Sequence, residues 1–374
     1  MSKAAELAAL IGSQTAQTGR NLLINGEHKV SQRGTSFTAQ GANGGPYFTD
    51  RWYAYSGGTS AGRFTATQEA ITDLAGFTSA IKFDCTTADT SIGADEQLSL
   101  IQAVEAQNLQ RLKFGTSDAV PLTYSFYAKA NAAKTYIAEL YAIDGTAQSQ
   151  SHAFNVTTSW QRFEITFSAT GANAATINND NGVGLYVNIN LHAGSNLTSG
   201  TINSTWLAAT PANRMPGCES FFSSTDNTFF MTGAQLEIGE TATPFEHRSF
   251  GDELARCKRY FERFERQRPG AGSAGTTSLW AGPARSGASN VQGPMHYVEK
   301  RNNPTISVSS AGHLNAIYPI SPFNAALSGF GIDGNAGTQS AYINATGSGS
   351  PGSDCASFVY IGDAAGYLDI DAEL

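Results

Sequence analysis

Several residues in the sequence could do chemistry, but most of them lack the spacing that a reaction requires. Gly58-Thr59-Ser60-Ala61-Gly62 has the Gly-x-Ser-x-Gly pattern of a nucleophilic serine, which needs a strand before the serine and a helix after it. Strand-like residues stand on both sides here, so a hairpin loop is the better interpretation. Asp333-Gly334-Asn335 begins like a calcium loop but lacks the glycine and the glutamate that complete one. We interpret it as a turn.

Metal and cofactor binding need clusters that the sequence does not show. No two of the six histidines are two or four residues apart, so no local pair of metal ligands is visible. We interpret the four cysteines as reduced thiols, with one long-range disulfide as the alternative, because they lie far apart at Cys85, Cys218, Cys257 and Cys355. No phosphate loop or dinucleotide-binding glycine motif occurs. The sequence therefore predicts no metal, no cofactor, no catalytic residue and no enzyme activity.

Charge and hydropathy argue against two further classes of partner. The formal net charge is −8, which is unfavourable for a surface that follows nucleic-acid phosphates. No apolar run approaches the roughly 18 residues of a membrane span, so we expect no membrane insertion. Residues 1–14 contain Glu6 and no apolar core, so we also expect no signal peptide.

Aromatic side chains are the remaining candidates for ligand contact. Exposed Trp and Tyr rings can form flat platforms for sugar rings. Because side chains alternate along a strand, Tyr53 and Tyr55 should share one face and Trp52 the other. We interpret Trp160 and Trp206 as core residues.

Strands are the elements that would position these rings. Charged residues make up 14% of the chain and glycines number 39, a composition that favours strands joined by tight turns. Apolar and polar residues alternate most clearly in four segments, which are 122–129, 136–141, 160–167 and 184–191. Residues 95–110 fit either a helix or a strand with polar flanks. Short strands at such intervals predict a mainly β fold with a β-sandwich.

One amphipathic helix is predicted over residues 252–267. Apolar residues recur there every three to four positions, at Leu254, Cys257, Phe261 and Phe264. Pro269-Gly270 provides the stop, and Glu262 and Arg266 are placed to form an i,i+4 ion pair. Glycine-rich strands follow. We therefore expect a sandwich over 21–250, and then a linking helix with a smaller β domain over 251–374.

A short helix is also predicted at the N-terminus, within residues 1–20. It presents Leu7, Leu10 and Ile11 as apolar residues. A helix of this length is not stable alone in water, so we expect it to dock on another molecule and act as an anchor.

Several segments, taken in order, resemble a known family. They are Asn21-Leu22-Leu23-Ile24-Asn25-Gly26, the segment 47–52, the strand 230–239, the helix 252–261 and Asn303-Pro304-Thr305. Together they resemble fibre proteins of tailed bacteriophages that contain a jelly roll like that of carbohydrate-binding modules. The resemblance covers roughly residues 21–310 and does not extend to the N-terminal segment or to the last part of the chain.

The resemblance implies a virion structural protein, made in the host cytoplasm, that serves as a tail fibre and recognises a host cell-surface glycan. Such fibres are usually trimeric, and we expect a homotrimer because the apolar stripes of both helices need partners. The alternative for the second stripe, at Leu254, Cys257, Phe261 and Phe264, is that it packs wholly on its own sandwich. The N-terminal segment would attach the fibre to other virion proteins. A capsid-attached head fibre is the first alternative, and a glycan depolymerase is the other.

Receptor contact is expected in the C-terminal domain, because that end is distal if the N-terminus is the anchor. The domain places single aromatic rings among Gly, Ser and Asn loops, a composition suited to binding. The predicted contact residues are Trp280, Tyr297, Tyr318, Tyr342 and Tyr360. The alternative places the glycan on the jelly roll, at Trp52 and Tyr55.

Overall fold

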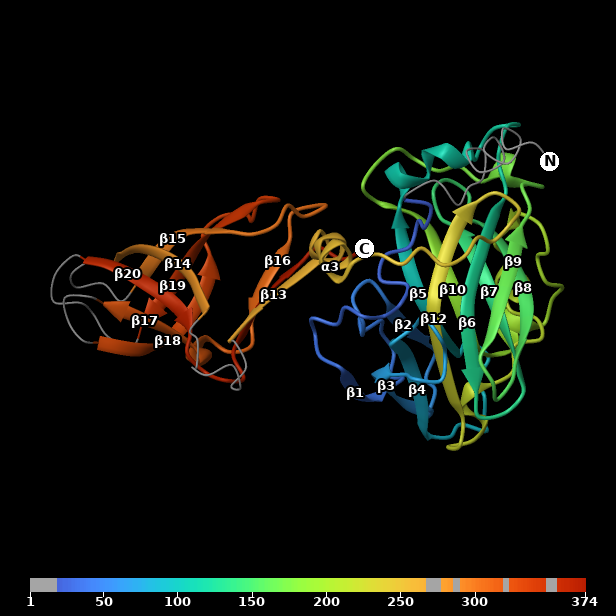
Figure 1. The fold of residues 1–374 in the computed structure, drawn as a ribbon, viewed down its shortest axis with the longest axis horizontal. Coiled ribbons are helices and arrows are strands. Elements are labelled where there is room, and N and C mark those ends of the chain that lie inside the picture. Colours follow the sequence, from blue (N-terminus) through green and yellow to red (C-terminus); the bar gives the residue numbers. More distant parts are fainter. Residues whose placement is uncertain (1–18, 267–276, 285–289, 319–322, 348–354) are drawn as a thin grey trace, which may run out of the picture. The chain divides into compact units, whose positions relative to one another are not determined.

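The chain forms two compact units, each built mainly of β-strands, as predicted (Figure 1). The first unit comprises residues 1–254 with Leu374, and the second comprises residues 255–373. The structure is a computed structural model that describes residues 19–266, 277–284, 290–318, 323–347 and 355–374.

The first unit is a sandwich of two six-stranded antiparallel sheets, named sheet A and sheet B. Sheet A consists, in spatial order, of β1 (Ser36–Gln40), β3 (Arg63–Ala70), β4 (Ser79–Thr87), β12 (Thr228–Ile238), β6 (Leu122–Ala130) and β9 (Gln161–Phe167). Sheet B consists of β11 (Leu207–Ala208), β8 (Gln148–Val156), β7 (Lys134–Ala142), β10 (Val183–Ala193), β5 (Gln97–Glu105) and β2 (Tyr53–Gly57). Many neighbouring strands are distant in sequence, which agrees with the jelly-roll expectation.

Alternation along the strands places apolar side chains between the two sheets. In β6, Tyr124 and Phe126 are fully buried in the main core. In β10, the core residues are Leu185, Val187 and Ile189, each separated from the next by one residue that faces the other way. Burial of each such side chain contributes roughly 1.5–3 kcal/mol, so this core is the main source of stability in the first unit.

The segments that carry the family resemblance lie side by side. The Leu22 N–H donates to the Leu236 carbonyl at 2.9 Å, and the Ala234 N–H donates to the Gly26 carbonyl at 3.0 Å. Asn21 Oδ1 accepts a further hydrogen bond from the Leu236 N–H at 3.0 Å. A Cβ at Gly26 would lie 2.1 Å from the Ala234 carbonyl oxygen, so only glycine fits there. The opening segment is thus fixed along β12.

The Gly-x-Ser-x-Gly segment joins β2 of sheet B to β3 of sheet A. The predicted hairpin is therefore wrong, because the connection crosses from one sheet to the other. A strand follows the serine, and Ser60 Oγ donates to the Asp89 carboxylate at 3.0 Å. The geometry of a nucleophile elbow is not formed.

Short helical turns connect the strands of the first unit. They are η2 (Ala106–Leu112), η3 (Ala172–Ala174), α2 (Ser195–Thr198), η4 (Pro211–Asn213) and η5 (Phe221–Ser223). Of the two interpretations of residues 95–110, the strand is correct for β5, and a 3₁₀ helix follows it.

The helix predicted over 252–267 is shorter than expected. It forms α3 (Phe250–Lys258), after which the chain enters a strand, β13 (Phe261–Glu265). The predicted ion pair between Glu262 and Arg266 is wrong, because Glu262 pairs instead with Lys258 at 3.1 Å and Lys300 at 3.0 Å. The spacing of apolar residues at Phe261 and Phe264 also suits a helix. These residues form a strand instead, because β13 pairs with β21, which lies far along the chain.

The second unit combines a three-stranded sheet with a closed six-stranded barrel (Figure 1). The sheet consists of β13, β21 (Tyr367–Asp371) and β16 (Thr305–Val308). The barrel consists, in order, of β14 (Thr277–Ala284), β15 (Asn290–His296), β19 (Ser340–Gly347), β18 (Phe323–Ile332), β17 (Leu314–Tyr318) and β20 (Cys355–Ile361). A 3₁₀ turn, η6 (Ala311–His313), precedes β17. This unit has its own core, which includes Val291, Leu314, Ile343 and Val359.

Within the described residues, no helix is both long enough and apolar enough to cross a membrane. All four cysteines are free thiols, as interpreted from their spacing.

Candidate functional site

The outer face of sheet B carries the most unusual set of side chains in the first unit. In the middle row of this face, Tyr53 of β2 pairs with Ile101 of β5, which pairs with Asn188 of β10. Asn188 in turn pairs with Glu139 of β7, and Glu139 pairs with Ser151 of β8. Directly paired residues point to the same side of a sheet. At about 4.8 Å per strand, this row crosses about 19 Å of the sheet.

Tyrosines lie on both sides of the middle row. On β10, Tyr186 lies two residues before Asn188 and pairs directly with Tyr141 of β7. Asn190 lies two residues after Asn188 and pairs with Ser99 of β5, which pairs with Tyr55 of β2. Four tyrosines from three strands therefore share this face. We name them the tyrosine platform: Tyr53, Tyr55, Tyr141 and Tyr186.

The platform rings are accessible to different degrees. Tyr55 is 43% exposed, whereas the other three are half-buried. The rings of Tyr141 and Tyr186 lie 6.4 Å apart between centroids, tilted by 36°. Burial raises the pKa of Tyr53 well above its ordinary value, and Tyr186 adds to the effect. The phenol of Tyr53 therefore stays protonated at neutral pH and can donate a hydrogen bond.

A buried ion pair lies on the same face of sheet B as the platform. The Glu139 carboxylate is fully buried and accepts from Arg214 Nε at 2.7 Å and Arg214 Nη2 at 2.8 Å. Asn188 Nδ2 donates to the same carboxylate at 2.9 Å. Burial acts against the charge of Arg214, but Glu139 outweighs it, so the pKa of Arg214 lies above its ordinary value. The two charges cancel, so the pair adds no net charge to this face.

Arg214 also contacts the rings themselves. It follows η4 in the chain, and its guanidinium lies over the Tyr141 ring at 4.4 Å from the centroid. Tyr55 acts electrostatically on the same guanidinium. Arg214 therefore lies near the platform rings and makes a cation–π contact with Tyr141.

Of the residues predicted in the jelly roll, one lies in the platform and one does not. Tyr55 is a platform residue. Trp52 is fully buried in the core, and its indole N–H donates to the Asn25 carbonyl at 3.1 Å. The assignment of Trp52 as a contact residue is wrong, because its ring faces the interior. The expected opposition of Trp52 to Tyr53 and Tyr55 is confirmed.

Most of the residues predicted in the C-terminal domain are also buried. Trp280, Tyr297 and Tyr360 are 5%, 9% and 6% exposed, and rings this enclosed cannot provide a stacking surface for a sugar. Tyr342 is 43% exposed on β19, and Tyr318 lies in β17. Trp280 and Tyr297 both belong to the core of the second unit.

The predicted anchor residues Leu7, Leu10 and Ile11 lie outside the described residues. Of the two tryptophans interpreted as core, Trp206 is fully buried, as expected. Trp160 is half-buried outside the main core, and its indole N–H donates to Asp73 at 2.9 Å.

The sequence interpretation missed Tyr141, Tyr186, Arg214 and Glu139. Their strands were recognised from alternation, so each tyrosine could be placed on a face of its own strand. Only the spatial order and register of the strands show that Tyr141 and Tyr186 lie on the same face of sheet B. Arg214 lies in a connection with no periodic pattern, so nothing local identified it.

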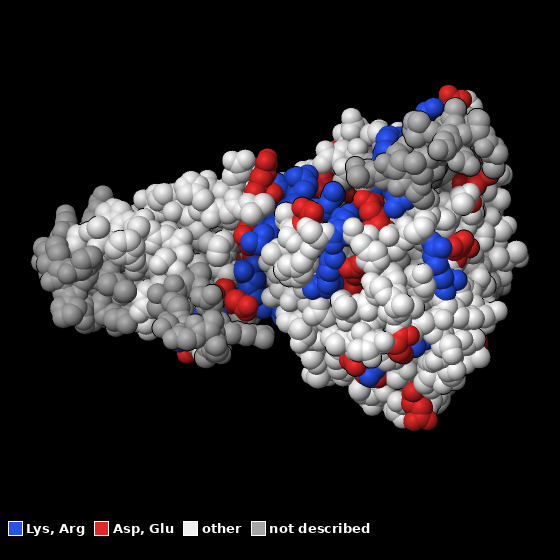
Figure 2. Space-filling model, viewed as in Figure 1, with Lys and Arg blue, Asp and Glu red and all other residues white. Residues whose placement is uncertain are grey.

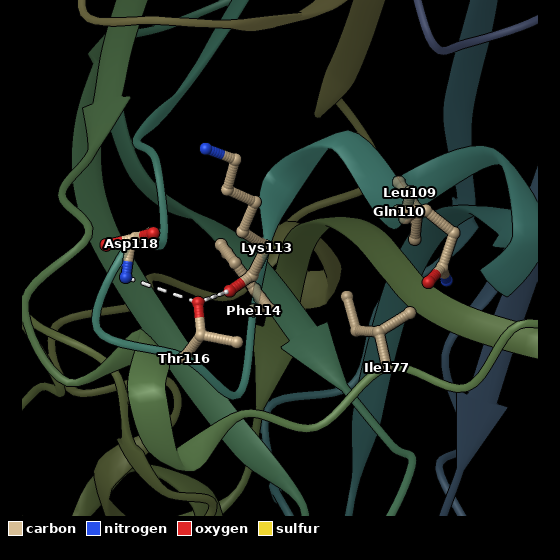
Figure 3. Close-up of a pocket in the computed structure, with 7 residues that line it drawn as sticks. All are labelled: Leu109, Gln110, Lys113, Phe114, Thr116, Asp118 and Ile177. Carbon is tan, nitrogen blue, oxygen red and sulfur yellow. Dashed lines mark hydrogen bonds between the residues drawn. The ribbon is translucent and has the colours of Figure 1, made fainter.

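A separate pocket of about 360 Å³ opens beside η2 (Figure 3). Leu109, Gln110, Lys113, Phe114, Thr116, Asp118 and Ile177 line it. Its single ring, Phe114, is only 9% exposed and packs edge-on against Trp206. Thr116 Oγ1 donates to the Lys113 carbonyl at 2.7 Å and accepts from the Asp118 N–H at 3.2 Å, so it stabilises its own turn. The pocket offers less ring surface than the platform.

Within the part of the chain that the structure describes, no group of three or more His, Cys, Asp or Glu residues is placed to hold a metal ion. The platform itself presents four tyrosine rings and the Glu139–Arg214 ion pair.

No family model matches the sequence, and no curated protein matches it. Among solved structures, a chain described as "CBM4 structure and function" is 13% identical, with 57% of this chain and 97% of that chain covered and a TM-score of 0.29. The enzymatically active domain of bacteriophage CBA120 tailspike protein 4 is 11% identical, with 59% and 21% covered and a TM-score of 0.29. A family 11 carbohydrate-binding module from Clostridium thermocellum is 11% identical, with 56% and 98% covered and a TM-score of 0.28. These scores do not assign the chain to a family.

Proposed function

We propose that this chain is a glycan-binding protein and that the tyrosine platform of sheet B holds the glycan. The observation that carries the proposal is the assembly of four tyrosines and Arg214 on one face, where the Glu139 carboxylate neutralises Arg214. Tyrosine rings give apolar contact to the C–H faces of sugars, and their hydroxyls can bond to sugar hydroxyls. Because strands and the Arg214 contact hold the rings, binding requires little ordering of side chains.

The finer proposal is that the protein is a tail fibre of a tailed bacteriophage, present in the virion as a homotrimer that recognises a host-surface glycan. The sequence resemblance supports it, as does the packing of the opening segment against β12, which joins two of the segments that carry that resemblance. Several copies per particle would raise the avidity of a weak single site. In this proposal the N-terminal segment attaches the fibre to other virion proteins.

The experiment compares two tyrosines of equal exposure. Tyr55 in the platform and Tyr342 in the barrel are each 43% exposed, so Tyr342→Ala is a matched control for Tyr55→Ala. The purified full chain is screened on an array of bacterial surface polysaccharides, and the affinity for the best ligand is measured by calorimetry. Tyr55→Ala should weaken the affinity of each single site at least about tenfold, which is 1.4 kcal/mol, while Tyr342→Ala should leave the single-site affinity unchanged.

Two results would overturn the proposal. Loss of affinity in Tyr342→Ala with no change in Tyr55→Ala would move the site to the barrel. Absence of binding to every polysaccharide would remove the glycan-binding function itself.

A further inference from the structure

The six strands of the barrel contain no charged residue. None of β14, β15, β17, β18, β19 and β20 includes an Asp, Glu, Lys or Arg. Soluble surfaces usually contain about 25–35% of these residues. On the face that Figure 2 shows, charged side chains are accordingly scarce over the barrel. Loss of charge is typical of the buried centre of a protein–protein interface.

Net charge is also divided unequally along the chain. Residues 255–373 contain nine Lys or Arg and nine Asp or Glu, so their formal charges cancel. The whole net charge of −8 therefore belongs to the rest of the chain. Two copies repel one another through like charges elsewhere, but they can approach through the barrel without that cost. A surface that must face its own copy is best left uncharged.

Two exposed rings stand on the outside of the barrel. Tyr342 of β19 is 43% exposed and Phe358 of β20 is 47% exposed. On one side of each ring the paired neighbour is small or compact: Pro294 lies opposite Tyr342, and Ala281 lies opposite Phe358. Both of these neighbours are exposed, so each ring projects above that side, as an aromatic anchor of an interface does. On the other side, Ile317 pairs with Phe358, and the N–H of the exposed Asp333 donates to the Tyr342 carbonyl at 2.9 Å.

The two rings lie on opposite sides of the barrel. The strand order is β14-β15-β19-β18-β17-β20 in a closed circle. Counted in either direction, β19 and β20 are three strands apart. One surface patch cannot include both rings, so an assembly that buries both must use two different faces of each copy.

We propose that the barrel binds a second copy of this chain, with the Tyr342 side of one barrel packed against the Phe358 side of the next. Contacts between unlike faces are heterologous, and they generate a ring where the rotation closes and an open chain where it does not. This inference rests on the self-association in the proposed function and names the surface responsible. The helix stripe expected to serve this purpose is not available, since Cys257 and Phe261 are 0% and 1% exposed within a single chain.

The experiment measures the mass of the full chain by sedimentation at micromolar concentration. Wild type should be an oligomer, and Tyr342→Lys and Phe358→Glu should each be a monomer, because either change disrupts every heterologous contact. Tyr55→Lys, at a platform position with the same exposure as Tyr342, is the matched control and should keep the wild-type mass. Circular dichroism of each variant establishes that it is folded.

Mixing the two monomeric variants gives the decisive result. The Tyr342 side of the Phe358→Glu copy and the Phe358 side of the Tyr342→Lys copy are both unaltered, so an equimolar mixture should associate again. Failure of the folded mixture to associate would overturn the heterologous arrangement. A wild-type monomer that still binds polysaccharide would overturn this inference and leave the glycan-binding proposal standing. An oligomer that neither substitution affects would place self-association elsewhere in the chain.

Discussion

Replacing Arg214 by methionine tests how strongly the Glu139–Arg214 ion pair on the platform face stabilises the first unit. In the wild type, the fully buried Glu139 carboxylate accepts two charge-assisted bonds from Arg214, at 2.7 and 2.8 Å. Methionine preserves much of the apolar stem of Arg214 but donates no hydrogen bond. The remaining bonds from the Asn188 and Asn190 side-chain amides, at 2.9 and 3.4 Å, cannot neutralise the carboxylate. Glu139 would be left as a buried charge without its partner.

The expected cost follows from this geometry. Loss of one partner of a buried ion pair destabilises a protein by about 3–5 kcal/mol. Two hydrogen bonds to a charged group, at about 1.5–3 kcal/mol each, give the same range. For a unit of this size, 1 kcal/mol corresponds to a shift of about 2–4 °C in Tm. Arg214→Met should therefore lower the Tm of the first unit by about 6–20 °C.

The assay is urea and thermal unfolding followed by tryptophan fluorescence and circular dichroism. The double variant Glu139→Gln, Arg214→Met should recover most of the loss, because it removes both charges. Lys82→Met is the surface control: its pair with Asp84 is partly exposed, and such pairs contribute about 0–1 kcal/mol. The reasoning is refuted if Arg214→Met costs no more than Lys82→Met, or if the double variant is less stable than Arg214→Met.

Two further predictions concern the core of each unit. Burial lowers the pKa of His28 to about 3, so the unfolded chain takes up the proton first as pH falls below about 6.5. Stability should then decline by about 1.4 kcal/mol per pH unit between pH 6.5 and 3. His28→Gln should flatten that part of the stability–pH curve, and an unchanged slope would contradict the assignment. In the barrel, a Cβ at Gly282 would lie 1.7 Å from the Gln292 carbonyl oxygen. Gly282→Ala should therefore separate β14 from β15 and destabilise the second unit by roughly 1–3 kcal/mol or more; an unfolding transition of that unit identical to wild type would show that the strands adjust without cost.

Alternation along the chain was enough to predict four of the twelve strands of the sandwich. The segments 122–129, 136–141, 160–167 and 184–191 coincide with β6, β7, β9 and β10 to within a few residues. Alternation also placed Tyr53 and Tyr55 opposite Trp52, and the structure confirms that arrangement. These successes share a cause, because the direction of a side chain on a strand depends only on the parity of its position.

Position along a strand does not reveal which strands are neighbours or what covers them. Residues 261–265 match a helix by their spacing, yet they form β13 because β21, about a hundred residues later, pairs with them. Trp280 has the residue type of a sugar-binding ring, yet the barrel closes around it and leaves it 5% exposed. Burial and pairing of this kind depend on contacts between distant segments, which local periodicity does not encode.

The tyrosine platform depends partly on the local sequence and partly on the tertiary structure. Sequence alone determined that Tyr55, Tyr141 and Tyr186 lie on strands, and it determined the parity of each. The tertiary structure decided that β2, β5, β10 and β7 lie next to one another in that order, with a register that sets Tyr53 in line with Asn188 and Glu139. A shift of one residue in any of these strands would turn its side chains to the opposite face. The register is held by the apolar core on the inner face, so the packing of one side of sheet B determines which side chains meet on the other.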